Sequence, residues 1–115
     1  MSVADDMKEV VLFGSIAYDK DVNGFIIASS KAIYSGTTTV ATAGTAEQLI
    51  EDLPCKRVHI KANPTNAGDV TIGGSTSQDY ILQPGEEITL NVANANIIYV
   101  NAANAGDGVN WLAEV

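Results

Sequence analysis

The chain is poor in the residues that most enzymes use for chemistry. Its 115 residues include one cysteine, Cys55, and one histidine, His59. One sulfur cannot form an internal disulfide, a redox pair or the ligand set of a structural zinc site. We therefore expect no disulfide, no metal and no cofactor. Cys55 follows Leu53-Pro54 at the entry to an apolar strand, where a buried and inert thiol is expected.

Basic residues are also scarce. Six lysines and arginines stand against 14 acidic residues, which gives a net charge of -8 and a pI near 4.2. Such a chain is repelled by phosphate backbones and by anionic membrane surfaces, so neither nucleic acid nor a membrane is an expected partner. Apolar residues make up 46% of the chain and charged residues 17%. One domain with one core is expected, its surface finished by small polar residues or covered by partners.

Long hydrophobic runs are missing as well. The apolar run 10–17 is too short to span a bilayer. The first nine residues carry Asp5, Asp6 and Glu9 against Lys8, unlike the basic start of a secretory signal. These features predict a protein that is made in the cytoplasm and stays out of membranes.

No pattern of residues predicts catalysis. The neighbouring carboxylates Glu86 and Glu87 lie at an expected turn, where their side chains diverge. A Ser-His-Asp set could use only His59, which is expected on the polar face of its strand. The pair Gly73-Gly74 ends a strand without opening a helix, so it does not predict a phosphate-binding loop. We expect no enzyme activity.

The second half of the chain contains short alternating apolar runs that are cut by strong turn signals. Alternation with a period of two is typical of half-buried β-strands. The expected strands, or parts of strands, are 37–42, 45–50, 57–62, 70–72, 80–82, 88–92, 97–100 and 109–112. The second of these is extended or briefly helical, and 97–100 is expected to be a nearly continuous buried run.

Two strands show their faces clearly. In 57–62 we expect Val58, Ile60 and Ala62 to face the core and Arg57, His59 and Lys61 to share the opposite face. In 88–92 the side chains of Ile88, Leu90 and Val92 are expected inside, and those of Glu87, Thr89 and Asn91 outside. Between the strands, Pro84-Gly85 is the signature of a type II turn, and 63–68 is a turn rich in Asn, Pro and Gly.

This spacing of strands and turns predicts an all-β fold, an antiparallel β-sandwich or jelly-roll-like barrel of about eight to ten short strands. We place the β-sandwich domain at residues 37–115 and an N-terminal hairpin or arm at residues 1–36. Two β-prone runs, 10–18 and 25–28, flank a loop that ends in Asn23-Gly24, which favours the hairpin. Helix is the competing prediction for 1–11.

The same loop matches the start of a calcium-binding loop. Its oxygen-bearing residues Asp19, Asp21 and Asn23 stand at positions 1, 3 and 5, followed by Gly24 at position 6. Such a loop needs a bidentate glutamate at position 12, where this chain has Ser30. The missing carboxylate removes two ligand oxygens, so a plain turn is favoured over calcium binding.

Several segments of the second half together resemble small structural proteins of tailed bacteriophages. The segments that carry the likeness are 44–49, 58–62, 66–73, 82–86, 98–100 and 106–112. The resemblance covers about residues 44–112 and implies a compact β-sandwich that serves as a capsid decoration protein, a head-fibre base or a tail component. It also implies location in the virion, association into homo-oligomers, by analogy trimers, and binding to the major capsid protein or another virion protein.

The apolar residues of the first third are the candidates for contact with a neighbouring copy or with the capsid. They are Leu12, Phe13, Ile16, Tyr18, Phe25, Ile27 and Tyr34. This segment either adds strands to the sandwich core or supplies such a contact.

Two other functions remain open at this point. One is a tail or baseplate component, and the other is a carbohydrate-binding sandwich module, which would use exposed aromatic rings. The candidates for sugar stacking are Tyr34, Tyr80, Tyr99 and Trp111. Of these, Trp111 is expected in the core, since it lies in a terminal strand beside Val109 and Leu112.

Overall fold

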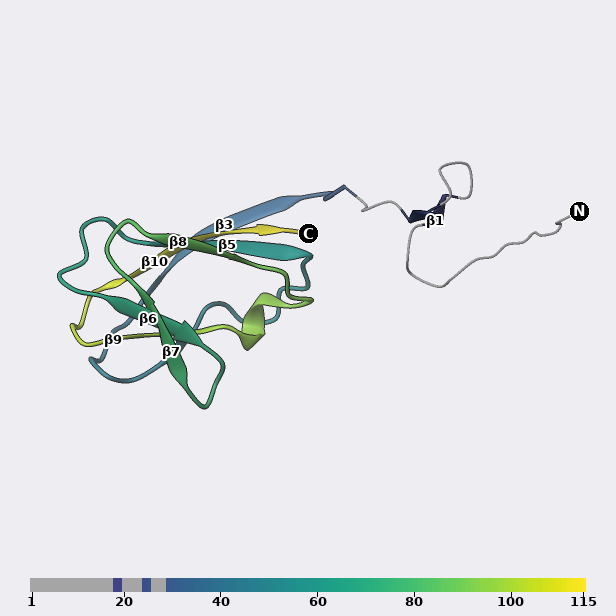
Figure 1. The fold of residues 1–115 in the computed structure, drawn as a ribbon. Coiled ribbons are helices and arrows are strands. Elements are labelled where there is room, and N and C mark those ends of the chain that lie inside the picture. The colour runs from purple at the N-terminus through teal and green to yellow at the C-terminus, as the bar shows by residue number, and fades with distance from the viewer. Residues whose placement is uncertain (1–17, 20–23, 26–28) are drawn as a thin grey trace, which may run out of the picture.

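The structure is a computed structural model that describes residues 18–19, 24–25 and 29–115. Ten β-strands and a short 3-10 helix make up its regular elements, in agreement with the all-β prediction (Figure 1). They are β1 (Tyr18–Asp19), β2 (Gly24–Phe25), β3 (Ile33–Thr39), β4 (Glu47–Gln48), β5 (Arg57–Ala62), β6 (Val70–Gly73), β7 (Gln78–Leu82), β8 (Glu87–Leu90), η2 (Ala95–Ile97), β9 (Tyr99–Ala102) and β10 (Gly108–Glu114).

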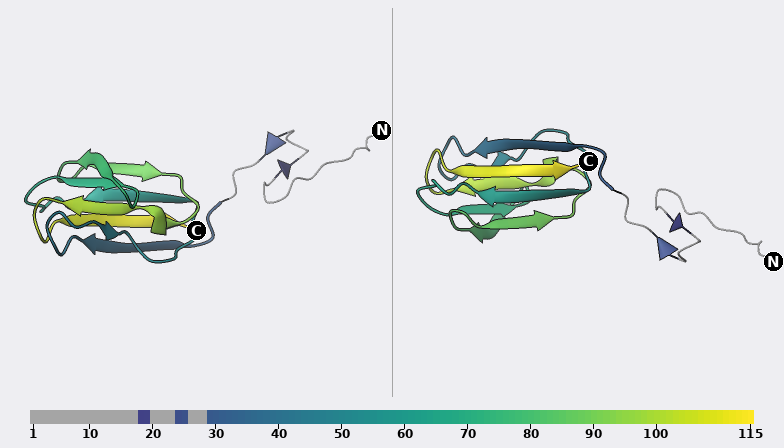
Figure 2. Two further views of the ribbon diagram at one scale, coloured as in Figure 1. Left: turned by 90° about the horizontal axis from the view of Figure 1, so that it is seen from below. Right: turned by 90° about the horizontal axis from the view of Figure 1, so that it is seen from above.

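Eight of the strands form two antiparallel sheets that pack face to face (Figure 2). Sheet I has the order β3-β10-β5-β8, and sheet II has the order β4-β9-β6-β7. From β3 to β10 the chain changes sheet at every connection except the β6-β7 hairpin. This strand order is that of an eight-stranded jelly roll, one of the two architectures that the sequence predicts.

The other two strands, β1 and β2, pair only with each other among the described residues, with Tyr18 opposite Phe25 and Asp19 opposite Gly24. The alternative helix at 1–11 lies outside the described residues. The sandwich itself begins earlier in the chain than residue 37. The proposed boundary after Gly36 falls in the middle of β3.

The core follows the predicted alternation. Val58, Ile60 and Ala62 are fully buried, and their neighbours Arg57, His59 and Lys61 lie on the outer face of sheet I. The strand β8 also has the predicted faces, since Glu87, Thr89 and Asn91 are exposed. The turn before β8 has Gly85 at φ +88° and a hydrogen bond from Glu86 N to Gln83 O of 2.9 Å, as a type II turn requires.

The prediction of a nearly continuous buried run at 97–100 is wrong at its first residue. Ile97 is 56% exposed, whereas Ile98 and Val100 are buried. The cause is η2, which is capped by Asn94, whose side chain accepts a hydrogen bond from Asn96 N. A 3-10 turn breaks the strand periodicity, so Ile97 faces outward and the alternation restarts at Ile98.

Trp111 lies in the core, as predicted, and links parts of both sheets. The residue is 7% exposed, and its Nε1 donates a hydrogen bond of 3.2 Å to Thr38 Oγ1 on β3. The Thr38 hydroxyl donates in turn to Leu49 O, just beyond β4. A Cβ atom at Gly36 would lie 2.7 Å from the ring, so this strand position has room only for glycine.

A buried carboxylate fixes the loop before β10. Asp107 is 5% exposed and accepts hydrogen bonds from Ala67 N and Gly68 N at 2.8 and 2.9 Å. Beside it, the Asn66 side chain accepts from Gly108 N and donates to Gly108 O, both at 2.9 Å. The predicted turn at 63–68 is therefore bonded to the start of β10.

Candidate functional site

The most organised polar surface lies where the chain enters β3 and leaves β10. Lys31 N and Ala32 N both donate to Val115 O, at 2.6 and 3.3 Å, and Val115 N donates back to Ala32 O at 2.9 Å. Lys56 Nζ donates to Ser29 O. Residues 29–32 are thus attached to the C-terminal end of β10 (Figure 1).

A second set of bonds at this end converges on Glu114. Its Oε1 accepts from Arg57 Nε and Nη2, both at 3.0 Å, and from Ser30 Oγ at 3.2 Å. Its Oε2 lies 2.8 Å from His59 Nε2, and His59 Nδ1 lies 2.9 Å from Thr89 Oγ1. We call these five residues the Glu114 cluster.

The cluster favours an ionised Glu114. The hydrogen bond from His59 lowers the pKa of this carboxyl below its usual value, desolvation opposes that effect, and Ser30 and Arg57 reinforce it. Three strands supply the participants, because β10 carries Glu114, β5 carries Arg57 and His59, and β8 carries Thr89. The carboxylate therefore joins neighbouring strands of sheet I to residue 30 of the preceding segment.

The geometry of the cluster suits attachment rather than nucleophilic chemistry. A hydrolytic triad needs the serine hydroxyl hydrogen-bonded to the imidazole, so that the imidazole can take its proton. Here Ser30 and His59 both bond to Glu114, and the carboxylate stands between them. The hydroxyl of Ser30 has no imidazole acceptor, and its proton is directed to Glu114.

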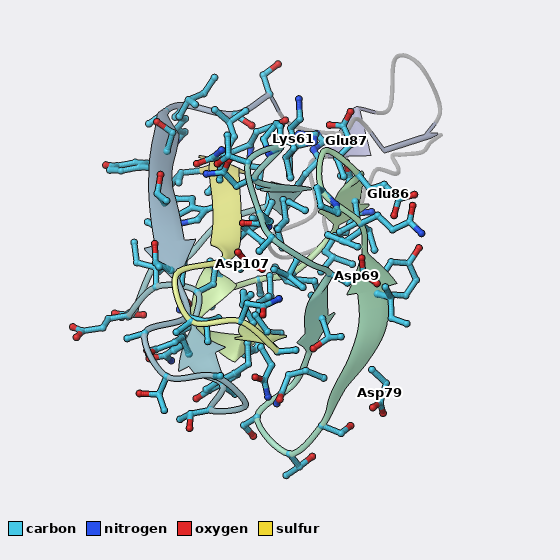
Figure 3. The ribbon with its side chains drawn as sticks, turned by 90° about the vertical axis from the view of Figure 1, so that its left-hand side faces the viewer. Lys61, Asp69, Asp79, Glu86, Glu87 and Asp107 are labelled. Atoms are coloured by element: carbon cyan, nitrogen blue, oxygen red, sulfur yellow. The ribbon has the colours of Figure 1, made fainter. Side chains whose placement is uncertain are left out.

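The structure places the other reactive residues apart from this cluster. Cys55 is half-buried, its Sγ donates to Val92 O at 3.3 Å, and burial raises the pKa of the thiol. Glu86 accepts from Gln83 N at 2.8 Å and closes its own turn, while Glu87 faces Lys61 across β8 and β5 (Figure 3). In the residues that the structure describes, no three His, Cys, Asp or Glu side chains gather as metal ligands.

The predicted contact residues fall into three groups. Leu12, Phe13, Ile16 and Ile27 lie outside the described residues, as do Asp21 and Asn23 of the calcium-type loop. Tyr18 and Phe25 are partners in the β1-β2 pair. Tyr34 stands near the start of β3 and is 50% exposed, next to Ile33, which is 64% exposed.

The sugar-stacking candidates are not brought together. Trp111 is buried, and the two most exposed tyrosines, Tyr34 and Tyr80, lie on edge strands of different sheets. Tyr99, on β9, is half-buried. A stacking platform requires neighbouring rings on one face, and these rings do not share one.

The two sheets differ in the charges that they carry. The outer face of sheet I mixes signs, with Arg57 opposite Glu114 and Lys61 opposite Glu87. Lys61 and Glu87 line a hollow of about 380 Å³ on this face. Sheet II carries Glu47, Asp69 near β6, and Asp79, with no lysine or arginine on its strands (Figure 3). Unlike sheet II, the outer face of sheet I thus offers cations as well as anions to a partner.

Sequence reasoning missed Ser30 and Glu114. The signal for Glu114 was present, because continuing the alternation of Asn110 and Leu112 puts residue 114 on the outer face of the last strand. Its pairing with Arg57, however, spans 57 residues of chain. Ser30 carries no local signal, since it belongs to no strand.

The chain matches no protein-family model, no curated protein and no solved structure. In the part of the chain that the structure describes, no helix is long and apolar enough to cross a membrane.

Proposed function

We propose that the chain is a structural protein of tailed-bacteriophage particles, a capsid decoration protein that associates with copies of itself and binds the major capsid protein. The observation that carries the proposal is the strand order of the two sheets, β3-β10-β5-β8 over β4-β9-β6-β7. Viral capsid proteins and lectins are among the proteins built on this eight-stranded jelly roll. The sequence resemblance over residues 44–112 supports the viral alternative.

Architecture alone does not assign function, so the proposal also rests on bonds in the interior and on exposed residues at one end of sheet I. The turn held by Asp107 and the Trp111–Thr38 bond make a rigid scaffold, and rigid partners lose little conformational entropy on binding. Residues 31 and 32 are anchored to the end of β10, and Ile33 and Tyr34, which follow them, are exposed apolar residues. This end of sheet I is the proposed side of capsid contact.

Particle mass tests the proposal. Capsids of the encoding phage, assembled without this protein, are mixed with increasing amounts of the full-length chain and weighed. We expect the mass gained per particle to saturate at a fixed number of copies. A chain that leaves the capsid mass unchanged but is found in purified tails would replace decoration with the tail function, and a chain absent from particles would end both.

A further inference from the structure

The strand β3 is an edge strand with a row of backbone hydrogen-bonding groups that no described residue occupies. It pairs with β10 over seven consecutive residue pairs without a register shift. No strand in the described part of the chain pairs with its other side, and β3 is one of the two edge strands of sheet I (Figure 2, right).

The contacts at both ends of β3 show which of its groups are free. Ala32 and Val115 exchange two backbone hydrogen bonds, and Val40 N donates to Asp107 O at 2.8 Å. Bonded and non-bonded pairs alternate along an antiparallel ladder, so the even-numbered residues of β3 bond to β10. The odd-numbered residues direct their N–H and C=O groups away from the sheet. They are Ile33, Ser35, Thr37 and Thr39, and the side chains of all four are exposed.

The other sandwich edges carry features that discourage the addition of a strand. The strand β8 has four residues, contains Glu87 and follows Pro84 and Glu86. The strand β7 contains Asp79 and has a register shift in its pairing with β6, and β4 has two residues, one of them a glutamate. Short length, charge and bulges are the usual protections of a sheet edge. The strand β3 has seven residues and none of these protections.

We propose that β3 is a self-association edge, where the β3 strands of two copies pair antiparallel about a two-fold axis at Gly36. In this register Ile33 lies opposite Thr39 of the second copy, and Ser35 lies opposite its Thr37. The odd-numbered residues meet in four pairs, each able to exchange two hydrogen bonds. The two copies of sheet I become one continuous sheet, and the two-fold symmetry closes the assembly at a dimer.

The strand fits a second copy for three reasons. It contains no charged residue, so two chains of net charge -8 can meet along it without placing like charges opposite each other. At the two-fold axis, Gly36 of one copy lies opposite Gly36 of the other in a non-bonded pair. Facing side chains come closest in such pairs, and glycine has no side chain to clash. Serine and threonine pairs on the outer face, and Tyr34 opposite Thr38 on the inner face, are favourable cross-strand neighbours.

This inference rests on the proposed function in one respect only, which is that copies of the chain associate. The expected assembly is a dimer and not the trimer that the resemblance implies. Its test therefore needs no capsid. Light scattering on the full-length chain is expected to give twice the 12.0 kDa chain mass, falling to the single mass on dilution. Thr37→Pro removes one outward N–H and is expected to give the single mass at every concentration.

Thr89→Pro on β8 is the matched control. Like Thr37, Thr89 is an exposed threonine on an edge strand, and its side chain lies on the outer face of sheet I. Each makes one side-chain hydrogen bond of 2.9 Å, Thr89 with His59 and Thr37 with Asn110. Because Ala62 N donates to Glu86 O, the same alternation turns the Thr89 N–H outward. The control is expected to stay dimeric. Equal loss of mass in both variants would overturn the assignment to β3.

Two further variants keep the test valid if proline unfolds the strand. Ser35→Lys keeps the backbone amide, places a charge on the edge and is expected to weaken the dimer at least tenfold. In a Cys55→Ala background, a short bismaleimide is expected to join copies of Thr37→Cys but not of Thr89→Cys. A monomeric full-length chain, a trimer, or equal cross-linking at both sites would overturn the inference. If that monomer still saturates capsids, the capsid-binding part of the proposed function stands without self-association in solution. A dimer that does not bind capsids would end the proposed capsid role and leave the β3 pairing in place.

Discussion

The two ends of β10 are each held by a carboxylate, in different ways. Asp107, just before the strand, is buried and accepts only backbone amides, those of Ala67 and Gly68. Glu114, at the other end, is partly exposed and accepts from the side chains of Arg57, His59 and Ser30. Backbone N–H donors are held in place by the fold itself, whereas side-chain donors can change rotamer and leave the carboxylate. The end of β10 at Asp107 is therefore held by a fixed set of bonds, whereas the attachment at Glu114 is adjustable.

Removing the buried carboxylate is the strongest test of this contrast. Asp107→Ala leaves two backbone N–H groups without acceptors in a part-buried site, and we expect a loss of about 2–3 kcal/mol in the free energy of unfolding. Urea unfolding followed by Trp111 fluorescence measures it, with the m value unchanged. Asp107→Asn keeps one acceptor oxygen and should lose less. Equal stability of the alanine variant and the original chain would show that solvent can replace the carboxylate.

The corresponding change at the other end should cost less. Glu114→Gln keeps the shape of the side chain and one acceptor oxygen, but it removes the charge that faces Arg57 and His59. Partly exposed ion pairs contribute little because water screens them. In the same urea experiment we expect a midpoint shift clearly smaller than that of Asp107→Ala. A shift of equal size would mean that the two ends are held with similar strength.

The sequence could predict features that depend on neighbouring residues but not the long-range bonds of Asp107 and Glu114. The alternation at Arg57–Ala62 and the Pro84-Gly85 turn are local patterns, and both gave the correct faces and the correct turn. Ile97 was misplaced because the side chain of Asn94 caps a 3-10 turn that changes the period. The bonds of Asp107 span about 40 residues and that of Glu114 to Arg57 spans 57. Such pairs depend on which strands become neighbours, and one sequence read locally does not determine that.

Acid should remove the difference between the original chain and Glu114→Gln. The pKa of Glu114 is lower in the folded protein than its usual value, so its ionised form stabilises the fold at pH values above the unfolded-state pKa. This contribution disappears as the pH falls through the lowered, folded-state pKa. Thermal unfolding of both chains from neutral to acid pH measures it, and their melting temperatures should converge at the acid end. A gap that stays constant with pH would assign the effect of the substitution to shape rather than charge.

The smallest expected effect is local and is seen only at the adjustable end. Ser30→Ala removes one of the hydrogen bonds to Glu114 and leaves the backbone bonds of Lys31 and Ala32 to Val115 in place. We expect faster amide hydrogen exchange at Lys31 and Ala32, because local opening of this segment becomes easier, with no change in global stability. The amides of Ala67 and Gly68, which bond to Asp107, serve as the internal reference and should exchange at the original rate. Faster exchange at both ends would mean that they open together. The proposed difference between the fixed end at Asp107 and the adjustable end at Glu114 would then be wrong.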